Sequence, residues 1–328
     1  MIWRGERRPG EVRIGGYGVD GRLLEIHLLR ADAGPEPGAV LAGRVRRDGV
    51  AAMLEWGGAP TALERAHACP EGALVLAEIV RAAIPEPGRL RPARARLVEG
   101  HASSVGLIAP GPPLEVRFPG LAWVQTLDGV DDALDLADCG EFPCGDFALS
   151  FERTRGGLVI DVDGGGDARK TNQAAAAEIA RLLRLYQVGG SVLIDFRAMT
   201  GRADRQAVTD VLLDAVRDDP RPCEHTAVNG YGLMQLVRAR PRPSALDVRC
   251  GVARHGADTA TLALELLAQA QRSIGAGVRT ITAPPAIAHW LQVQQALQAE
   301  VAQRLGAALV IVAEPAMSGY GHVHVEYC

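Results

Sequence analysis

The segment GLVIDVDGGGDARKTNQAAAAEIARLLRLYQVGGSVLIDF, residues 157–196, carries the strongest pattern in the chain. Its first apolar run stops abruptly at acidic residues and glycines, which predicts a short buried strand. Apolar residues then recur at helical spacing within 179–186, and the following glycine pair ends the predicted helix. A second apolar strand ends at Asp195. A strand, a helix and a strand in about 40 residues predict an α/β unit.

Each of the two predicted strands places an aspartate, Asp161 or Asp195, near its carboxyl end. Two carboxylates within a few ångströms repel each other unless a cation lies between them. Mg²⁺ accepts one or two carboxylates together with water and phosphate oxygens, and it can activate water against a phosphodiester. The glycines after Asp163 leave room for a phosphate backbone. The alternative is that one aspartate only caps the following helix or turn.

The sequence GGGDARKT at 164–171 is similar to a phosphate-binding P-loop. The P-loop pattern requires a glycine immediately before the lysine, where this chain has Arg169 before Lys170. That difference argues against a nucleoside triphosphatase.

The rest of the chain predicts an α+β protein of several domains. Strands are expected at 11–14 and 22–29, and short strands between glycine-rich turns at 39–97 predict a small β-barrel. Residues 100–145 have the composition of a linker. A helix is expected at 204–217, and a small α+β module follows residue 258.

The bulk composition excludes some classes of protein. The net charge of −4 gives no global indication of nucleic-acid binding, although arginines gather at 81–96 and 238–242. Each arginine run is either a solvated surface or a phosphate contact. No CxxC pair and no apolar stretch of about 20 residues occur, so we expect a cytoplasmic protein without a membrane segment.

The segment from VIDVDGGG through KTNQAAAAEIARLLRLYQVGGSVLIDFRAM to NGYGLMQLVRARPRPSAL resembles the catalytic core of the ribonuclease E/G family. The resemblance implies a DNase I-like α/β catalytic domain, an S1-like barrel of the OB type and a small C-terminal α+β domain. The implied divisions are N-terminal strands of an RNase H-like remnant (1–30), the barrel (31–100), a shortened linker (101–145), the catalytic domain (146–245), a zinc-link connector (246–258) and the C-terminal domain (259–328).

The same resemblance implies a Mg²⁺-dependent endoribonuclease that cleaves single-stranded RNA, with Mn²⁺ as a possible substitute metal. The family's metal-binding aspartates fall on Asp161 and Asp195. Asp163 stands where the family usually has Asn, which adds a third negative charge to the predicted catalytic group.

The predicted RNA contacts lie in the barrel and in the core. The barrel's stacking aromatic is replaced by Met53, the second expected aromatic falls near Ala62 or Leu63, and Arg91 is a basic contact. The remaining candidates are core residues that contact phosphate or line the RNA path: Arg169, Lys170, Tyr231, Arg238 and Arg240. For Arg169 and Lys170 the alternative is a charged helix start.

Two features of the family are expected to be missing. The short interval before the core leaves no room for 5′-monophosphate sensing, and the family's CPxC zinc link retains only Cys250, with Ala253 at the partner position. One thiolate per protomer cannot form a four-sulfur site, so no zinc is expected, with or without the nearby His255. A homo-oligomer without the zinc link remains possible.

Two alternatives stay open. His322, His324 and Glu326 alternate along the last predicted strand, either as a metal trio or as ordinary polar residues of an edge strand. The chain as a whole is either the nuclease or a catalytically weakened, RNA-binding regulatory homologue.

Overall fold

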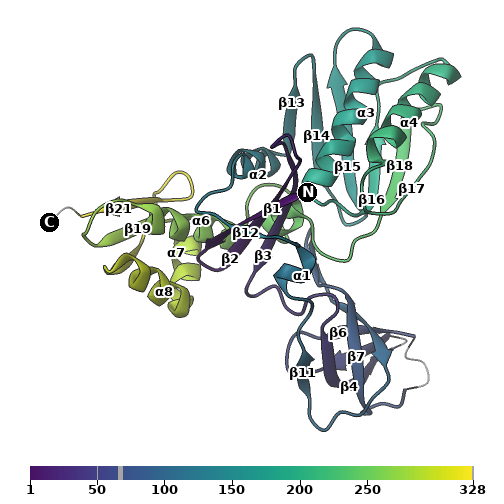
Figure 1. Ribbon diagram of the computed structural model, residues 1–328. Helices are drawn as coiled ribbons and strands as arrows, with labels where there is room; N and C mark the ends of the chain where they lie inside the picture. Colours follow the sequence, from purple (N-terminus) through teal and green to yellow (C-terminus); the bar gives the residue numbers. More distant parts are fainter. Residues whose placement is uncertain (50, 66–68, 327–328) are drawn as a thin grey trace.

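The computed structural model describes residues 1–49, 51–65 and 69–326. This part of the chain forms a mixed, multidomain α+β structure with five β-sheets and eight helices (Figure 1). Within these described residues, none of the helices combines the length and apolar character needed to cross a membrane.

The N-terminal sheet contains more strands than the sequence indicated. The predicted pair corresponds to β2 (Glu11–Tyr17) and β3 (Leu23–Arg30), and β1 (Ile2–Arg8) pairs antiparallel with β2. The short β12 (Ala122–Trp123) completes the order β12-β1-β2-β3. Ile26 and Leu28 of β3 belong to the core of the central unit, so this sheet packs against that unit.

The predicted small barrel is present as a closed ring of five strands. Pairing between the fifth and the first strand of the ring closes it around buried Leu41, Leu54 and Ile79. The segment 74–81 forms one of these strands, as the expectation of short strands at 39–97 requires. The strands follow the ring order β4 (Val40–Asp48), β5 (Ala51–Glu55), β6 (Thr61–Glu64), β10 (Arg94–Val98) and β7 (Leu74–Arg81).

The interval that resembled a linker is more structured than its composition indicated. Its elements join three different sheets, because each short strand adds to an edge that another part of the chain provides. Besides β12, the strands are β11 (Gly106–Ala109), which joins the barrel, and β13 (Glu141–Cys144), which joins the central sheet. The helices are α1 (Leu114–Arg117) and α2 (Val130–Cys139).

The central unit contains the predicted strand–helix–strand segment. Strands β15 (Leu158–Gly164) and β16 (Gly190–Asp195) pair in parallel and are joined by α3 (Ala168–Leu185). The sheet order is β13-β14-β15-β16-β18-β17, and all its other pairings are antiparallel. The remaining elements are β14 (Phe147–Arg153), α4 (Arg202–Val216), β17 (Cys223–His225) and β18 (Leu233–Arg238).

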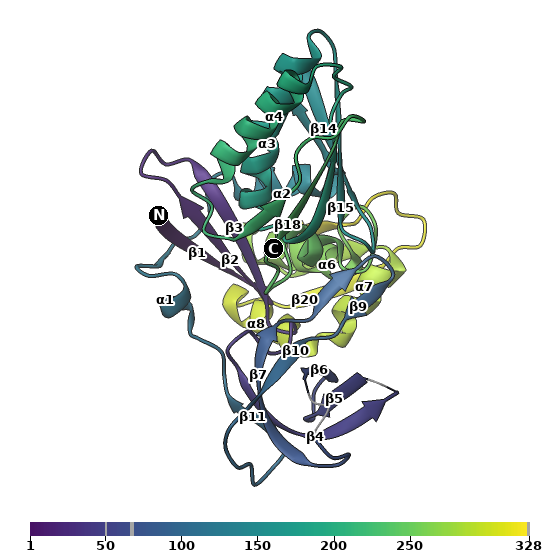
Figure 2. The ribbon, with the colours of Figure 1, turned by 90° about the vertical axis from the view of Figure 1, so that its right-hand side faces the viewer.

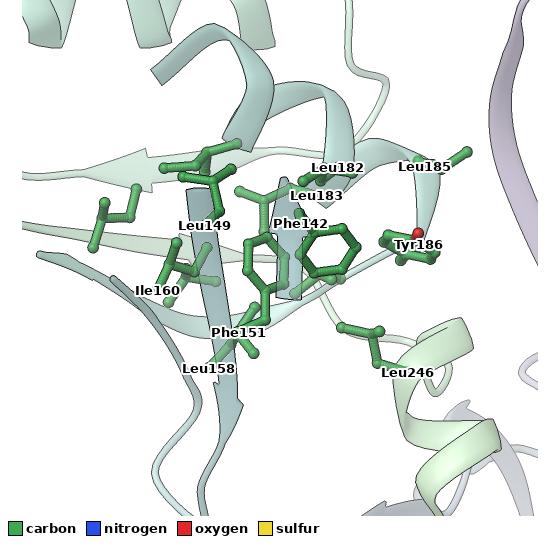
Figure 3. Close-up of a cluster of buried hydrophobic side chains, with 14 of the residues drawn as sticks. Phe142, Leu149, Phe151, Leu158, Ile160, Leu182, Leu183, Leu185, Tyr186 and Leu246 are labelled. Carbon is green, nitrogen blue, oxygen red and sulfur yellow. The ribbon is translucent and has the colours of Figure 1, made fainter. Parts of the chain in front are cut away.

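One face of this sheet carries the core, and α3 and α4 cover it (Figure 2). Strand alternation sends Leu149 and Ile160 into that core, where they meet Leu183 of α3 (Figure 3). Phe142 packs against the ring of Phe151, with centroids 4.6 Å apart. The residues that alternate with these buried ones along each strand point to the opposite face of the sheet, which is largely exposed.

The C-terminal part begins with α5 (Ala245–Cys250), which occupies the start of the predicted connector. The predicted α+β module follows, with the sheet order β20-β19-β21. Two consecutive helices follow Pro284 in this module, and they meet at Gln294. The elements are α6 (Thr259–Arg272), β19 (Arg279–Ala283), α7 (Pro285–Val293), α8 (Gln295–Leu305), β20 (Leu309–Ala313) and β21 (His322–Val325).

A hairpin of β8 (Ile84–Glu86) and β9 (Arg89–Arg91) connects the barrel to the central unit. Arg153, at the end of β14, donates to the carbonyl oxygen of Pro85 at 2.9 Å. The barrel is therefore anchored near the end of the central sheet where β15 begins.

Candidate active site

Asp161 and Asp195 lie side by side on the open face of the central sheet. The parallel register pairs them directly, on strands that are about 4.8 Å apart. Their neighbours Ile160, Val162 and Ile194 are buried under the helices, so alternation turns both aspartates to the solvent-facing side. Asp163 is exposed on the same face, two residues further along β15.

The neighbouring carboxylates raise the cost of ionising Asp161. Partial burial raises the pKa of Asp161, and the negative charges of Asp163 and Asp195 raise it further, against a backbone hydrogen bond from Val162. Such mutual repulsion favours a bound cation.

The donor set fits Mg²⁺, which binds one or two carboxylates and completes its shell with water and phosphate oxygens. Among residues 1–49, 51–65 and 69–326, no group of three or more His, Cys, Asp or Glu side chains could hold a metal by itself. The aspartate pair supplies two carboxylates, which is within the number that Mg²⁺ takes from a protein.

Two neighbours of the aspartate pair had no sequence signal. Ser150 of β14 pairs with Asp161 on one side and with Glu141 of β13 on the other. The Ser150 hydroxyl donates to Glu141 Oε1 at 2.6 Å. The Glu141 charge also raises the pKa of Asp161, after larger contributions from burial and from the two aspartates. Glu141 fell within the linker-like interval, and only tertiary pairing brings its strand to this sheet.

The loops that follow the two strands are tied to each other. The Asn172 side chain donates to the Arg197 carbonyl oxygen at 2.8 Å and accepts from the Arg197 backbone N–H at 3.2 Å. The Arg197 guanidinium donates to the carbonyl oxygen of Gly165 at 2.9 Å. Asn172 and Arg197 thus fix the glycine-rich loop against the end of β16, and sequence reasoning missed both.

The candidate phosphate contacts at the start of α3 are on the surface. Arg169 forms an ion pair with Asp204 at 3.2 Å and is half exposed. Lys170 is exposed, and its backbone N–H donates to the N-cap side chain of Asp167 at 3.2 Å. Both alternatives for this pair, phosphate contact and charged helix start, remain compatible with these positions.

Tyr231 projects from the turn that precedes β18, with 85% of its surface exposed. The next strand residue, Leu233, pairs with Asp195, so the ring emerges close to the aspartates. Gly232 has φ +91°, and a Cβ there would lie 2.4 Å from the carbonyl oxygen of Phe196. The close approach therefore requires glycine and fixes the turn beside the site.

The predicted RNA contact at Arg238 is corrected by the structure. The Arg238 side chain has no exposed surface, because strand alternation turns it toward the helices. It donates to the carbonyl oxygens of Leu183 and Val188 and pairs with Asp219.

Arg240 is also engaged inside the protein. Its side chain is 17% exposed and pairs with Asp247 at 2.9 Å and with Glu86 at 3.3 Å. Both arginines therefore hold parts of the protein together; Arg238 has no surface to offer RNA, and the RNA contact of Arg240 stays a prediction.

In the barrel, Met53 is half-buried and lies in register between Arg46 and Ala62. Leu63 points into the barrel core, which leaves Ala62 as the outward-facing position of the two. No ring occupies this row, as the sequence indicated.

Arg91 belongs to a basic cluster at the base of the barrel. It is half exposed and lies 3.4 Å from Glu86. Burial, followed by the charges of Arg91 and Arg94, lowers the pKa of Arg81 to about 10. Arg91 pairs with Glu86 and Arg94 pairs with Glu64 at 2.5 Å, so carboxylates neutralise part of this cluster.

The residues considered for zinc or another metal do not form a donor group. Cys250 is buried in α5, where burial raises the pKa of its thiol, whereas His255 is exposed. His322, His324 and Glu326 are exposed on or beside β21, and they are not among any metal-binding group within the described ranges. Edge-strand alternation accounts for this trio; the zinc expectation stays a prediction.

Comparison with known proteins finds a similarity in the central unit. Residues 143–241 match the profile of the Ribonuclease E/G family. Ribonuclease E of Escherichia coli (strain K12) is 39% identical over 95 residues, which is 29% of this chain and 8% of that protein. Ribonuclease G of the same organism is 39% identical over 83 residues, 24% of this chain and 16% of that protein.

A third relative is the chloroplastic ribonuclease E/G-like protein of Arabidopsis thaliana. It is 32% identical over 108 residues, which covers 30% of this chain and 11% of that protein. The similarity thus spans less than a fifth of each of these relatives. The family profile covers most of the sheet that bears the two aspartates.

Proposed function

We propose that the protein is an endoribonuclease of RNA processing, on the premise that its residues 143–241 belong to the ribonuclease E/G family. The proposed reaction is Mg²⁺-dependent hydrolysis of single-stranded RNA, with Mn²⁺ as a possible substitute. The observation that carries the proposal is the direct pairing of Asp161 with Asp195 on an uncovered sheet face.

In this proposal Asp161 and Asp195 hold the metal, and Asp163 borders the scissile phosphate. When bound, Mg²⁺ supplies electrostatic stabilisation of the charge that develops on the phosphate. The protein orients both carboxylates through the parallel register and through the Asn172–Arg197 bonds behind them.

The open face offers a path for an extended polymer. Leu193 and Val237 are exposed on it, together with Gln235, and Tyr231 stands at the end where the aspartates lie. Apolar surface beside an exposed ring suits unpaired bases, which stack on aromatic side chains.

We further propose that the barrel has an S1-like, OB-type fold and that the central unit is DNase I-like. The closed five-stranded ring supports the former assignment, because OB folds bind nucleic acid with such barrels. The row of Arg46, Met53 and Ala62 and the basic cluster around Arg91 are its proposed RNA-binding features. The proposed domain boundaries are 31–100 for the barrel, 146–245 for the catalytic unit and 259–328 for the C-terminal domain.

A catalytically weakened RNA-binding homologue is the second candidate. Asp163 favours it, because a third carboxylate on the aspartate face repels a phosphate. Both candidates bind RNA, and cleavage alone separates them.

The decisive experiment is cleavage of a fluorescently labelled single-stranded RNA, with Mg²⁺ and with EDTA. We expect Mg²⁺-dependent cutting by the wild type and a loss of at least about 100-fold for Asp161→Asn and Asp195→Asn. Asp210→Asn, an exposed position on α4, is the matched control and should retain activity.

The possible outcomes are distinct. Cutting that survives both aspartate substitutions would refute the assignment of the site. RNA binding without any cutting by the wild type would favour the weakened homologue.

A further inference from the structure

A cavity of about 350 Å³ lies away from the aspartates, where β3, the exit of the barrel and α5 meet. Its volume is in the range of small-molecule sites, which start at roughly 300 Å³. Gln187 lines it and precedes β16, whereas Asp195 ends that strand. The two places are thus separated by the length of β16, roughly 17 Å at 3.3 Å per residue.

The polar wall of this cavity is dominated by guanidinium groups. Four arginines line it against three carboxylates, which leaves one positive charge in excess. They are Arg30, Arg117, Arg221 and Arg242, with Asp32, Glu36 and Asp258.

The excess positive charge lies on three of these arginines, Arg117, Arg221 and Arg242. A single oxygen, Oε2 of Glu36, serves both Arg242, at 2.6 Å, and Arg117, at 3.3 Å. The Arg221 guanidinium donates to Gln187, at 2.8 Å to its carbonyl oxygen and at 2.6 Å to its side-chain oxygen. No carboxylate of the described part of the chain lies within ion-pair distance of this guanidinium, although the Arg221 backbone N–H donates to Asp219 at 2.9 Å.

The charges in this wall act against each other. Burial, then the charge of Arg238 and more weakly that of Arg242, lower the pKa of Arg221 to about 10, although nearby carboxylates oppose the shift. Burial lowers the pKa of His27, another lining residue, which favours the neutral imidazole, so the positive charge of this wall comes from the arginines. Two guanidinium groups that share one carboxylate, beside a third that has no ion pair within the described residues, are an incomplete ion-pair network, which an anion would complete.

The rest of the wall is apolar. Ala82, Ala83 and Leu90 come from the barrel side, and Val248 and Val252 from α5 and its end. A ligand that matches the whole cavity therefore has an anionic head and a compact body that tolerates apolar contacts.

We propose that this cavity binds a small organic phosphate, about the size of a nucleoside monophosphate, with its phosphoryl group held by Arg117, Arg221 and Arg242. Arginine suits this role because its planar donors match phosphate oxygens in pairs. The ligand would join β3, the barrel exit and α5 from a position distinct from the aspartate site. This inference does not depend on nuclease activity.

The test is isothermal titration of the full-length protein with adenosine 5′-monophosphate, adenosine and inorganic phosphate. We expect one saturable site for the monophosphate and at least tenfold weaker binding of adenosine. Arg221→Gln should weaken the monophosphate at least tenfold, whereas Arg217→Gln, an exposed arginine outside the cavity, should change it less than twofold.

A second variant guards against a folding defect in Arg221→Gln. Val252 lies at the cavity wall with half of its surface exposed, so Val252→Trp can obstruct the cavity without disturbing a core. It should weaken the monophosphate at least tenfold and leave the thermal unfolding midpoint unchanged.

Three results would overturn the proposal. The first is that the monophosphate shows no saturable binding. The second is that Arg217→Gln weakens monophosphate binding as much as Arg221→Gln does. The third is that a 5′-phosphorylated oligoribonucleotide binds in an Arg221-dependent way while the mononucleotide does not bind. The last would identify an RNA-end site instead.

Discussion

Arg238 and Tyr231 lie seven residues apart and differ completely in environment. The Arg238 side chain is fully buried and paired with Asp219, which is itself 5% exposed, while Tyr231 is 85% exposed. A buried ion pair that loses one partner leaves the other charge uncompensated. Stability and RNA binding should therefore depend on different residues of this one segment.

We expect Arg238→Met to lower the free energy of unfolding by about 3–5 kcal/mol, because Asp219 would be left buried without its partner. Urea denaturation followed by circular dichroism measures this change. Tyr231→Ala should change stability by less than about 0.5 kcal/mol and should weaken single-stranded RNA binding instead. A stable Arg238→Met variant with reduced RNA affinity would contradict the correction made for Arg238.

Asp163 adds a negative charge where a phosphate is proposed to bind. Asp163→Asn should raise kcat/KM for RNA cleavage several-fold, because the amide removes repulsion and offers a donor. Steady-state cleavage at fixed Mg²⁺ measures the effect, with Asp167→Asn, the helix cap, as a neighbouring control. A fall in activity would instead make Asp163 a required carboxylate.

At the scale of elements, Asn172 connects α3 to the loop after β16. It is fully buried, and its two hydrogen bonds to the Arg197 backbone run in opposite directions. A buried backbone group that loses its partner carries a desolvation cost of about 1–3 kcal/mol. The contact fixes where β16 ends, and therefore where Asp195 stands.

Asn172→Ala should lower stability by about 2 kcal/mol and reduce kcat for RNA cleavage more than it changes KM. The reason is that the substitution loosens the support of Asp195 without touching RNA. Thermal unfolding and steady-state kinetics measure the two effects. Gln173→Ala, at the next residue of α3, should leave both stability and kcat nearly unchanged. An equal loss of kcat in the two variants would argue against a positioning role for Asn172.

At the scale of the whole molecule, a buried ionic network joins the N-terminal sheet to the helices that follow the central unit. Glu265 of α6 pairs with Arg13 of β2 at 2.5 Å and with Arg249 of α5 at 2.8 Å. Arg8 pairs with Glu6 and with Asp131 of α2. Elements that are distant in sequence are thus held by charges as well as by apolar packing.

This network predicts loss of stability in acid. Burial acts to raise the pKa of Glu265, but Arg13 and Arg249 outweigh it and lower the pKa to about 2 from an ordinary value of 4.5. A depressed pKa means that the carboxylate stabilises the fold above about pH 4.5 and loses that contribution as the pH falls toward 2.

We expect Glu265→Gln to be about 3 kcal/mol less stable than the wild type at pH 7 and nearly equal to it at pH 2. Urea denaturation across this pH range measures the difference. Glu300→Gln, in a half-exposed helical pair with Arg304, should show little difference at any pH. A Glu265→Gln deficit that is independent of pH would show that packing, not charge, explains the contact.

The sequence by itself determined the local elements of the central unit and the aspartates at their ends. Alternation, helical spacing and glycine stops are properties of neighbouring residues, so the strand–helix–strand segment was predictable. The barrel followed from short strands between turns for the same reason. The family resemblance added roles for Asp161 and Asp195 that spacing alone left open.

Only the tertiary structure decided which of these residues meet and which face they occupy. The parallel register set Asp161 beside Asp195, and the same sheet turned Arg238 inward and away from any ligand. Glu141 lies beside the site because β13, a strand from the linker-like interval, pairs with β14 at the edge of the central sheet. Register and edge pairing depend on hydrogen bonds between segments distant in sequence, and these leave no periodic pattern within either segment.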